Sequence, residues 1–318
     1  MAVYTQVESN DIEALLRRFQ LGGLRSFRGI AEGVENSNFL IESDQARYIL
    51  TLYEKRVDPA DLPFFLGLMD HLNAAGIACP LPLRDASGAQ LFTLKQRPAA
   101  LISYLDGVSI ESPSAQHCTQ LGGALADLHR AQAGFNGRRK NALSLEGWAS
   151  LVDKTSAAAD TVTPGLSGIL ARERGALEAF WPASGALPEG VIHADLFPDN
   201  VFFLKGKLSG IIDFYFACND ALAYDVAICL NAWCFDKTHR FLSDRADALL
   251  QGYQAVRALT SAEQAALPML CRGAAFRFLL TRLYDWLNPA PGALVKPKDP
   301  RDYVARLQHF QSASERTL

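Results

Sequence analysis

The sequence predicts an α+β fold with two lobes, a small N-terminal lobe with an antiparallel sheet over residues 1–104 and a larger, mainly helical lobe over residues 105–318. Three observations support this prediction. The chain of 318 residues is long enough for two lobes around a cleft rather than one compact core. Short apolar runs bounded by turn residues, typical of strands, are concentrated before residue 105. Beyond that point, apolar residues recur mostly at helical spacing.

The predicted N-terminal lobe contains two helices and several strands. The first helix has Ser9 and Asn10 as candidate caps and continues to Phe19, and the second follows Asp58 and ends at Gly76. The strands are expected at residues 39–41, 48–53, 89–95 and 99–105. A short polar turn separates the first two strands, so we expect them to pair.

The larger lobe is predicted to begin with a helix capped by Ser112, with a proline at the first helical position. Residues 134–168 are rich in small and polar residues and have weak periodicity, so no element is assigned there. Two strand-like runs, residues 201–204 and 208–213, flank a Lys-Gly-Lys turn and predict a short hairpin. Helical patterns then continue to the end, apart from the proline-rich residues 288–300.

The composition excludes several classes of function. A net charge of −3 gives no electrostatic basis for binding nucleic acid or an anionic membrane. The first ten residues lack the basic and apolar regions of a signal peptide, and no apolar run is long enough to span a bilayer. The six cysteines form no C-x-x-C pair or zinc-ligand spacing, which predicts reduced, mostly buried thiols. We therefore expect a cytoplasmic protein that binds neither nucleic acid nor membrane, whose oligomeric state the sequence leaves open.

The chemistry is concentrated in H-A-D-L-F-P-D-N-V at residues 193–201 and I-I-D-F at residues 211–214. An aspartate, an asparagine five residues later and an aspartate at the end of the next apolar strand have the spacing of a kinase catalytic loop. We predict that Asp195 accepts the proton of a substrate hydroxyl. Phosphoryl transfer from ATP requires a cation such as Mg²⁺ to offset the negative charge on the phosphate oxygens. Asn200 and Asp213 are the predicted ligands of this Mg²⁺, because both offer hard oxygens. Such a match alone occurs by chance, but here apolar strands are predicted at the expected positions.

These segments resemble the aminoglycoside-phosphotransferase and choline-kinase superfamily, a branch of the protein-kinase-like fold. The L-G-x-x-L-A-x-L-H helix at residues 121–129 is similar to a helix of the same superfamily. Less specific segments, among them residues 29–39, 49–54 and 213–215, resemble the bacterial homoserine kinases of this fold. The resemblance implies a bilobal kinase-like fold, ATP as co-substrate with Mg²⁺, and phosphorylation of the side-chain hydroxyl of L-homoserine in threonine biosynthesis.

The resemblance also implies roles for residues around the catalytic loop. His193 is expected to support the loop backbone, and Asp225 is expected to brace the loop as a structural carboxylate. Asp199 is interpreted as a carboxylate on the loop surface, with a contact to metal or substrate as the alternative.

ATP is expected to contact the glycine- and amide-rich stretch near residue 33 and the connection between the lobes. Backbone N–H groups of such a stretch can cover phosphates, although the pattern is not G-x-G-x-x-G. Adenine is expected against the connection between lobes, as the resemblance implies. Thr51 stands where many kinase-like proteins have a phosphate-binding lysine, and Lys55 or Arg56 could compensate. The predicted nucleotide contacts are Gly33, Asn36, Ser37, Asn38, Thr51, Ser103, Tyr104 and Leu105.

A pocket for homoserine needs a cationic group, an anionic or carbonyl-rich group and space beside Asp195. The candidates in the helical lobe are Tyr215, Asn231, Trp233, Arg277 and Arg282. Each has an alternative without a ligand, in which Trp233 is a core residue and the two arginines form ion pairs at the surface.

Other functions stay open at this point. A kinase for an aminoglycoside, choline, methylthioribose or hydroxylysine would have the same catalytic loop, because the fold does not fix the acceptor. A catalytically silent nucleotide-binding protein is supported only by Thr51. A protein kinase is disfavoured, because Tyr215 replaces the glycine of D-F-G and no A-P-E motif follows.

Overall fold

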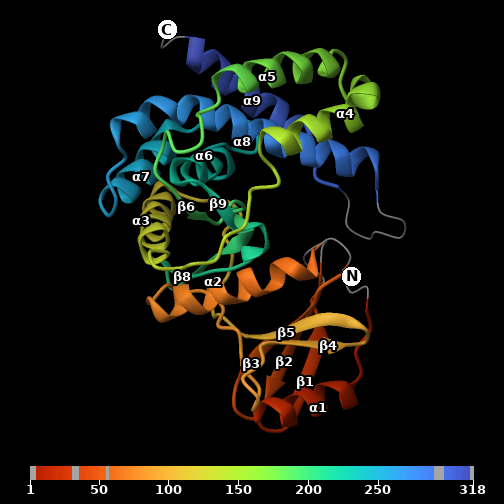
Figure 1. Ribbon diagram of the computed structural model, residues 1–318. Helices are drawn as coiled ribbons and strands as arrows, with labels where there is room; N and C mark the ends of the chain where they lie inside the picture. Colours follow the sequence, from red (N-terminus) through yellow and green to blue (C-terminus); the bar gives the residue numbers. More distant parts are fainter. Residues whose placement is uncertain (1–4, 31–35, 55–56, 290–296, 316–318) are drawn as a thin grey trace.

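The computed structural model describes residues 5–30, 36–54, 57–289 and 297–315, and it has the two predicted lobes (Figure 1). The smaller lobe contains a five-stranded sheet in the order β1-β2-β3-β5-β4, in which all neighbours are antiparallel. Its elements are α1 (Ser9–Phe19), β1 (Leu24–Gly29), β2 (Ser37–Ser43), β3 (Arg47–Leu52), α2 (Leu62–Ala74), β4 (Leu91–Leu94) and β5 (Arg97–Ser103). The predicted antiparallel sheet is therefore confirmed.

A small core joins α1 to the sheet. Ile12 and Leu16 of α1 pack with Ile41 and Leu50, all of them buried. The helix begins after Glu8, not at a cap formed by Ser9 or Asn10 as predicted, because Glu8 and Asp11 make a reciprocal capping box.

Helix α2 lies between the sheet and the larger lobe (Figure 1). Its apolar residues, including Phe65 and Leu66, belong to the same core cluster as residues of the larger lobe such as Leu125 and Phe214. The large core thus extends into the N-terminal part of the chain, and the domain boundary after residue 104 stays a prediction.

The larger lobe is mainly helical, with two short β-ribbons. Its helices are α3 (Ala115–Ala131), α4 (Leu145–Val162), α5 (Leu166–Phe180), α6 (Leu222–Trp233), α7 (Ser243–Gln254), α8 (Ser261–Leu287) and α9 (Arg301–Glu315). Its strands are β6 (Glu189–Ile192), β7 (Val201–Leu204), β8 (Lys207–Ile211) and β9 (Cys218–Ala221). No helix within the described ranges is long and apolar enough to cross a membrane.

Two expectations for this lobe need correction. Helix α3 is capped by Ser114 instead of Ser112, because Ser114 and His117 satisfy each other's backbone N–H groups. Residues 134–168, which showed little periodicity, contain α4, whose buried face includes Trp148 and Val152. All six cysteines are free and buried, in agreement with the sequence.

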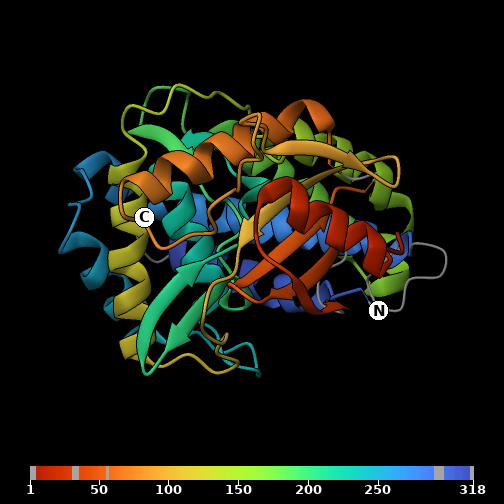
Figure 2. The ribbon, with the colours of Figure 1, turned by 90° about the horizontal axis from the view of Figure 1, so that it is seen from below.

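The two ribbons hold the segments that carry the predicted chemistry. Strands β6 and β9 pair antiparallel, and the β7–β8 hairpin forms where the sequence predicts it. The hairpin lies beside α3 (Figure 2), where the side chain of Gln120 bonds the backbone of Gly206 and Leu208. Residues 193–200 therefore leave one ribbon and enter the other, which fixes both ends of the catalytic loop.

Candidate active site

Asp225 of α6 holds the start of the catalytic loop. The backbone N–H groups of His193 and Ala194 donate hydrogen bonds to its carboxylate at 2.7 and 2.9 Å. His129 Nε2 lies 3.3 Å from the same carboxylate. Burial alone would raise the pKa of Asp225, but the hydrogen bond with His129 and the nearby His193 hold it below its ordinary value. These contacts agree with the bracing role expected from the resemblance.

His193 connects the loop to the strand end that carries Asp213. Its side chain is buried, and burial lowers the pKa of His193, which favours the neutral ring. Nε2 lies 2.9 Å from the carbonyl oxygen of Ile212, and the N–H of Asp195 donates to Nδ1 at 3.3 Å. A neutral ring with the proton on Nε2 satisfies both contacts. This agrees with the expected support of the loop backbone.

Asp195 lies at the surface of this loop, with about 20 % of its side chain exposed. Burial raises the pKa of Asp195, and the positive charge of Arg277 opposes that rise. Arg277 Nη2 is 3.9 Å from Asp195 Oδ1, and Arg277 Nη1 donates a hydrogen bond to the carbonyl of Ala194. The alternative that Arg277 is a surface residue is wrong, since only 2 % of it is exposed.

Asn200 and Asp213 are brought to the same end of the β7–β8 hairpin. The N–H of Ile212 donates to the carbonyl of Asn200 at 3.0 Å, directly before Asp213. The amide nitrogen of Asn200 donates to the carbonyl of Asp195 at 2.8 Å, so its amide oxygen points elsewhere. Asp213 is exposed and has a left-handed backbone with φ 66°, uncommon for a residue other than glycine.

This pair fits Mg²⁺ in its chemistry. Carboxylate and amide oxygens are ligands of magnesium, which usually keeps several water and phosphate oxygens as well. Within the residues that the structure describes, no group of three or more His, Cys, Asp or Glu side chains could enclose a metal. A magnesium ion held by Asn200 and Asp213 would therefore take its other ligands from water or from the phosphates of a nucleotide.

Three of the predicted nucleotide contacts, Asn36, Ser37 and Thr51, are buried and hydrogen-bonded within the N-terminal lobe, so none of them can touch a ligand in this structure, whereas Asn38 is partly exposed. Thr51 Oγ1 donates to Asn38 Oδ1 at 2.8 Å, and Ser37 Oγ donates to Glu54 Oε1 at 2.8 Å. The N–H of Glu54 donates to the side chain of Asn36 at 3.3 Å. Gly33, Lys55 and Arg56 lie outside the described residues.

Sequence reasoning missed a cation near this group. Arg97 Nε lies 3.1 Å from Glu54 Oε2 and is about one-third exposed. It stands at the start of β5, where no motif distinguishes it from an ordinary arginine at the end of a strand.

The connection between lobes differs from the expected adenine contact. The N–H of Ser103 donates to Leu81 at 2.9 Å, and the N–H of Tyr104 donates to Arg47 at 3.3 Å. These two N–H groups are thus used within the protein, because the connection pairs with the segment before β4 and with β3, and the contacts of adenine with backbone N–H and C=O groups of residues 103–105 stay a prediction. Leu105, the third predicted contact of adenine, is partly exposed.

Burial contradicts the prediction that Trp233 and Asn231 contact the acceptor. Trp233 is 1 % exposed, and its indole N–H donates to the carbonyl of Leu196 at 2.9 Å. Asn231 has no exposed surface, and its amide donates to the carbonyls of Ala227 and Cys271, each at 3.0 Å. Neither can touch a ligand in this structure, so both are supports of the loop and core.

Tyr215 and Arg282, the remaining candidates for the acceptor pocket, make different contacts. Tyr215 O–H lies 3.0 Å from Tyr53 O–H, and burial raises the pKa of Tyr215 to about 12, so it stays neutral. Its hydroxyl is thus directed to the N-terminal lobe. Arg282 forms an ion pair with Asp302 at 3.0 Å, as its alternative interpretation predicted.

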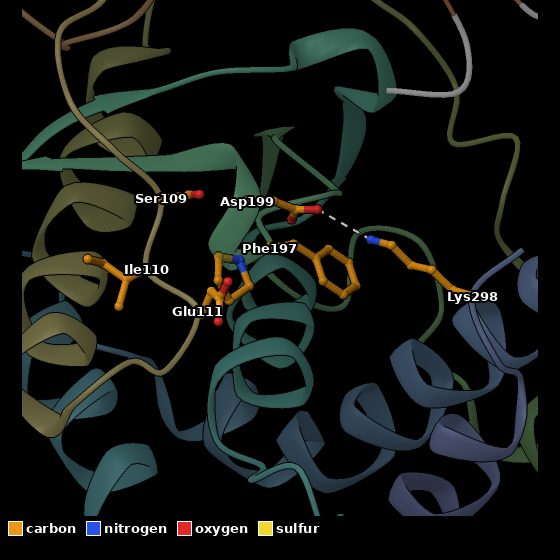
Figure 3. A pocket seen from close by; sticks show the side chains of 7 residues that line it. Ser109, Ile110, Glu111, Phe197, Asp199 and Lys298 are labelled. Carbon is orange, nitrogen blue, oxygen red and sulfur yellow. Dashed lines mark hydrogen bonds and ion pairs between the residues drawn. The ribbon is translucent and has the colours of Figure 1, made fainter. Parts of the chain in front are cut away.

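A cavity of about 260 Å³ opens beside the catalytic loop. Figure 3 labels residues that line it, Ser109, Ile110, Glu111, Phe197, Asp199 and Lys298. Asp199 is exposed, as predicted, and Lys298 Nζ lies 3.3 Å from its Oδ2. Lys298 was not a predicted site residue, since the proline-rich stretch around it has no periodic pattern.

Comparison with known proteins shows the family to which the chain is similar. Residues 26–259 match the model of a family described as the phosphotransferase enzyme family. The chain is 59 % identical to a homoserine kinase of Azorhizobium caulinodans, with 99 % of this chain and 97 % of that protein covered. It is 57 % identical to a homoserine kinase of Methylobacterium radiotolerans, with 99 % and 98 % covered.

Solved structures of low sequence identity share the fold. An aminoglycoside phosphotransferase from Alicyclobacillus acidocaldarius has a TM-score of 0.68 at 16 % identity, with 98 % of this chain and 96 % of that chain covered. A Plasmodium vivax ethanolamine kinase has a TM-score of 0.64 at 15 % identity, with 96 % and 85 % covered. The bilobal protein-kinase-like fold is thereby confirmed.

Proposed function

The chain belongs to the phosphotransferase enzyme family, and we propose that it transfers the γ-phosphoryl group of ATP to the side-chain hydroxyl of L-homoserine. The observation that carries this proposal is the identity of 56–59 % with homoserine kinases over nearly the whole chain. The catalytic loop supports it, because Asp195 lies beside the oxygen-bearing pair Asn200 and Asp213. The product is O-phospho-L-homoserine, and a cytoplasmic location is part of the proposal.

Asp195 orients the acceptor hydroxyl and accepts its proton. A general base is most effective when its pKa approaches the operating pH while the group stays ionised. Burial raises the pKa of Asp195, and Arg277 limits that rise, so the two influences favour an ionised carboxylate of increased basicity. The contacts of Asp225 and His193 with the backbone hold this carboxylate in place.

Asn200 and Asp213 would hold Mg²⁺. When bound, the ion neutralises charge on the phosphate oxygens of ATP. The partly exposed residues Asn38, Ser103, Tyr104 and Leu105 stay the proposed contacts on the nucleotide side. The buried residues Asn36, Ser37 and Thr51 would act by supporting them. Thr51 donates a hydrogen bond to Asn38, and the side chains of Ser37 and Asn36 are bonded to Glu54, so polar groups at this end of the sheet are held in place.

The test is release of ADP by the purified chain with Mg-ATP over a panel of acceptors. The panel contains L-homoserine, L-serine, L-threonine, hydroxylysine, choline, methylthioribose and kanamycin. We expect turnover with L-homoserine and a loss of about 100-fold to 10,000-fold in Asp195→Asn. Removal of the metal with a chelator should abolish turnover, and Asp213→Asn should raise the Mg²⁺ concentration needed for half-maximal rate. Preference for another acceptor would retain the chemistry and refute the homoserine assignment.

A further inference from the structure

The cavity beside the catalytic loop is formed in part by the segment that carries Asp195. Phe197 and Asp199 follow Asp195 along the loop, and both line the cavity (Figure 3). Lys298 reaches the same cavity from the segment before α9. The cavity and the catalytic carboxylate therefore share one loop, although Asp195 itself is not among the residues that line the cavity.

The cavity presents one positive and one negative group side by side. Lys298 Nζ is 3.3 Å from Asp199 Oδ2 and 5.4 Å from the centre of the Phe197 ring. The side chain of Lys298 is 62 % exposed and that of Asp199 is 63 % exposed. An ion pair exposed to this extent contributes little to stability, so exchanging its partners for the charges of a ligand has a small cost.

Both charges act on Asp195. The ammonium of Lys298 lowers the pKa of Asp195 and the carboxylate of Asp199 raises it, in addition to the larger influence of burial. The side-chain amide nitrogen of Asn200, the residue after Asp199, lies 3.3 Å from Asp195 Oδ2, so the turn of the loop brings the segment that carries Asp199 back to the catalytic carboxylate.

We propose that Lys298 binds the α-carboxylate and Asp199 binds the α-ammonium of the amino-acid acceptor, whose hydroxyl then reaches Asp195. This inference rests on the proposed function. L-homoserine has both charges at one end and the hydroxyl at the other, which matches a site with the ion pair on one side and the base on the other.

The charges of the cavity separate the acceptor classes. Choline has no anion for Lys298 to bind. Arg277 is a weaker candidate for the carboxylate, because it is 2 % exposed and already bonds the carbonyl of Ala194.

The test compares Lys298→Met and Asp199→Asn on three acceptors. L-homoserine has both charges, 3-aminopropan-1-ol lacks the carboxylate, and 4-hydroxybutyrate lacks the ammonium. We expect Lys298→Met to raise KM for L-homoserine about 10-fold to 100-fold, as for the loss of a hydrogen bond to a charged group. Its KM for ATP should stay close to that of the unaltered chain, and so should its kcat when both are measured at a pH at which Asp195 is ionised.

The analogues distinguish recognition from a structural effect. Lys298→Met should have little effect on kcat/KM for 3-aminopropan-1-ol, and Asp199→Asn should have little effect on that for 4-hydroxybutyrate. Lys207→Met, which removes a positive charge from the exposed turn of the β7–β8 hairpin, is the matched control and should leave all constants unchanged.

Two outcomes would overturn the inference. If both variants phosphorylate L-homoserine with unchanged KM, or lose activity equally on all three acceptors, the pair does not recognise the amino-acid end, and the proposed function stands. If the unaltered chain does not phosphorylate L-homoserine, the proposed function and this inference fail together.

Discussion

The carboxylate of Asp195 is subject to two opposing influences from its surroundings. Burial disfavours its charge and raises the pKa, whereas the guanidinium of Arg277, 3.9 Å away, favours the charge. Arg277 is itself buried and also bonds the carbonyl of Ala194. One side chain thus affects both the ionisation of the base and the shape of its loop.

Replacing Arg277 should move the acid limit of activity. Arg277→Met removes a positive charge, so the pKa of Asp195 rises further. A base acts when deprotonated, so activity increases with pH through this pKa, and the acidic limb of kcat/KM should shift to higher pH. Arg277→Lys keeps the charge and should keep the limb nearer to its original position. The measurement is a pH profile of kcat/KM for each variant.

A purely structural role of Arg277 would give a different profile. In that case Arg277→Met would lower kcat/KM at every pH and leave the midpoint of the acidic limb where it is in the unaltered chain.

The residues of the site differ in how well the sequence predicts them. Asp195, Asn200 and Asp213 lie within one short loop and the next hairpin, so their spacing together with the predicted strands indicates that they lie close together. Arg277 and Lys298 come from segments far along the chain, and only packing of α8 and the segment before α9 brings them to the loop. No local pattern shows which face of a helix will be directed to a distant loop.

At the scale of elements, the close crossing of α3 and α7 supports the site. A Cβ atom added to Gly122 would lie 2.1 Å from the carbonyl oxygen of Leu249, and one added to Gly252 would lie 2.1 Å from that of Thr119. The crossing places the hydroxyl of Tyr253 2.8 Å from Nδ1 of His129, which contacts Asp225. The glycine of the L-G-x-x-L-A-x-L-H helix thus has a packing role.

A methyl group at this crossing should lower stability. Gly252→Ala places its Cβ against backbone, which cannot move without separating the helices, and we expect the free energy of unfolding to fall by about 1–3 kcal/mol. Gly175→Ala in the exposed part of α5 meets no atom within 4 Å and should be neutral or stabilising by up to about 1 kcal/mol. Urea denaturation of both variants measures the difference. Equal stability of the two would contradict a close crossing of α3 and α7.

Elements whose buried face is made of small residues were the hardest to predict. Helix α4 has Thr155 and Ala159 at buried positions between larger residues, which weakens its hydrophobic periodicity. Its stability comes from packing against α5 and α8, which a local pattern does not contain. The cap of α3 was misplaced by two residues because Ser112 and Ser114 both suit that position, and the choice depends on His117.

At the scale of the whole molecule, contacts between the lobes join the end of β3 to the segment that follows Asp213. Tyr53 at the end of β3 meets Tyr215 just after Asp213, and both rings pack near Phe65 of α2. The sequence predicted two lobes because strands and helices segregate along the chain. It could not predict that α2 joins the larger core. The choice of acceptor molecule depends on a few side chains in the site, so the fold alone does not determine which acceptor is phosphorylated.

The central claim is tested most directly by identifying the product made from Mg-ATP and L-homoserine. Phosphorus NMR with proton coupling distinguishes a phosphate ester on the side-chain carbon from free phosphate. We predict one equivalent of a monoester coupled to the two protons of the side-chain CH₂, formed together with ADP and lost in Asp195→Asn. Formation of ADP with inorganic phosphate alone, or the same monoester at an undiminished rate in Asp195→Asn, would contradict the account.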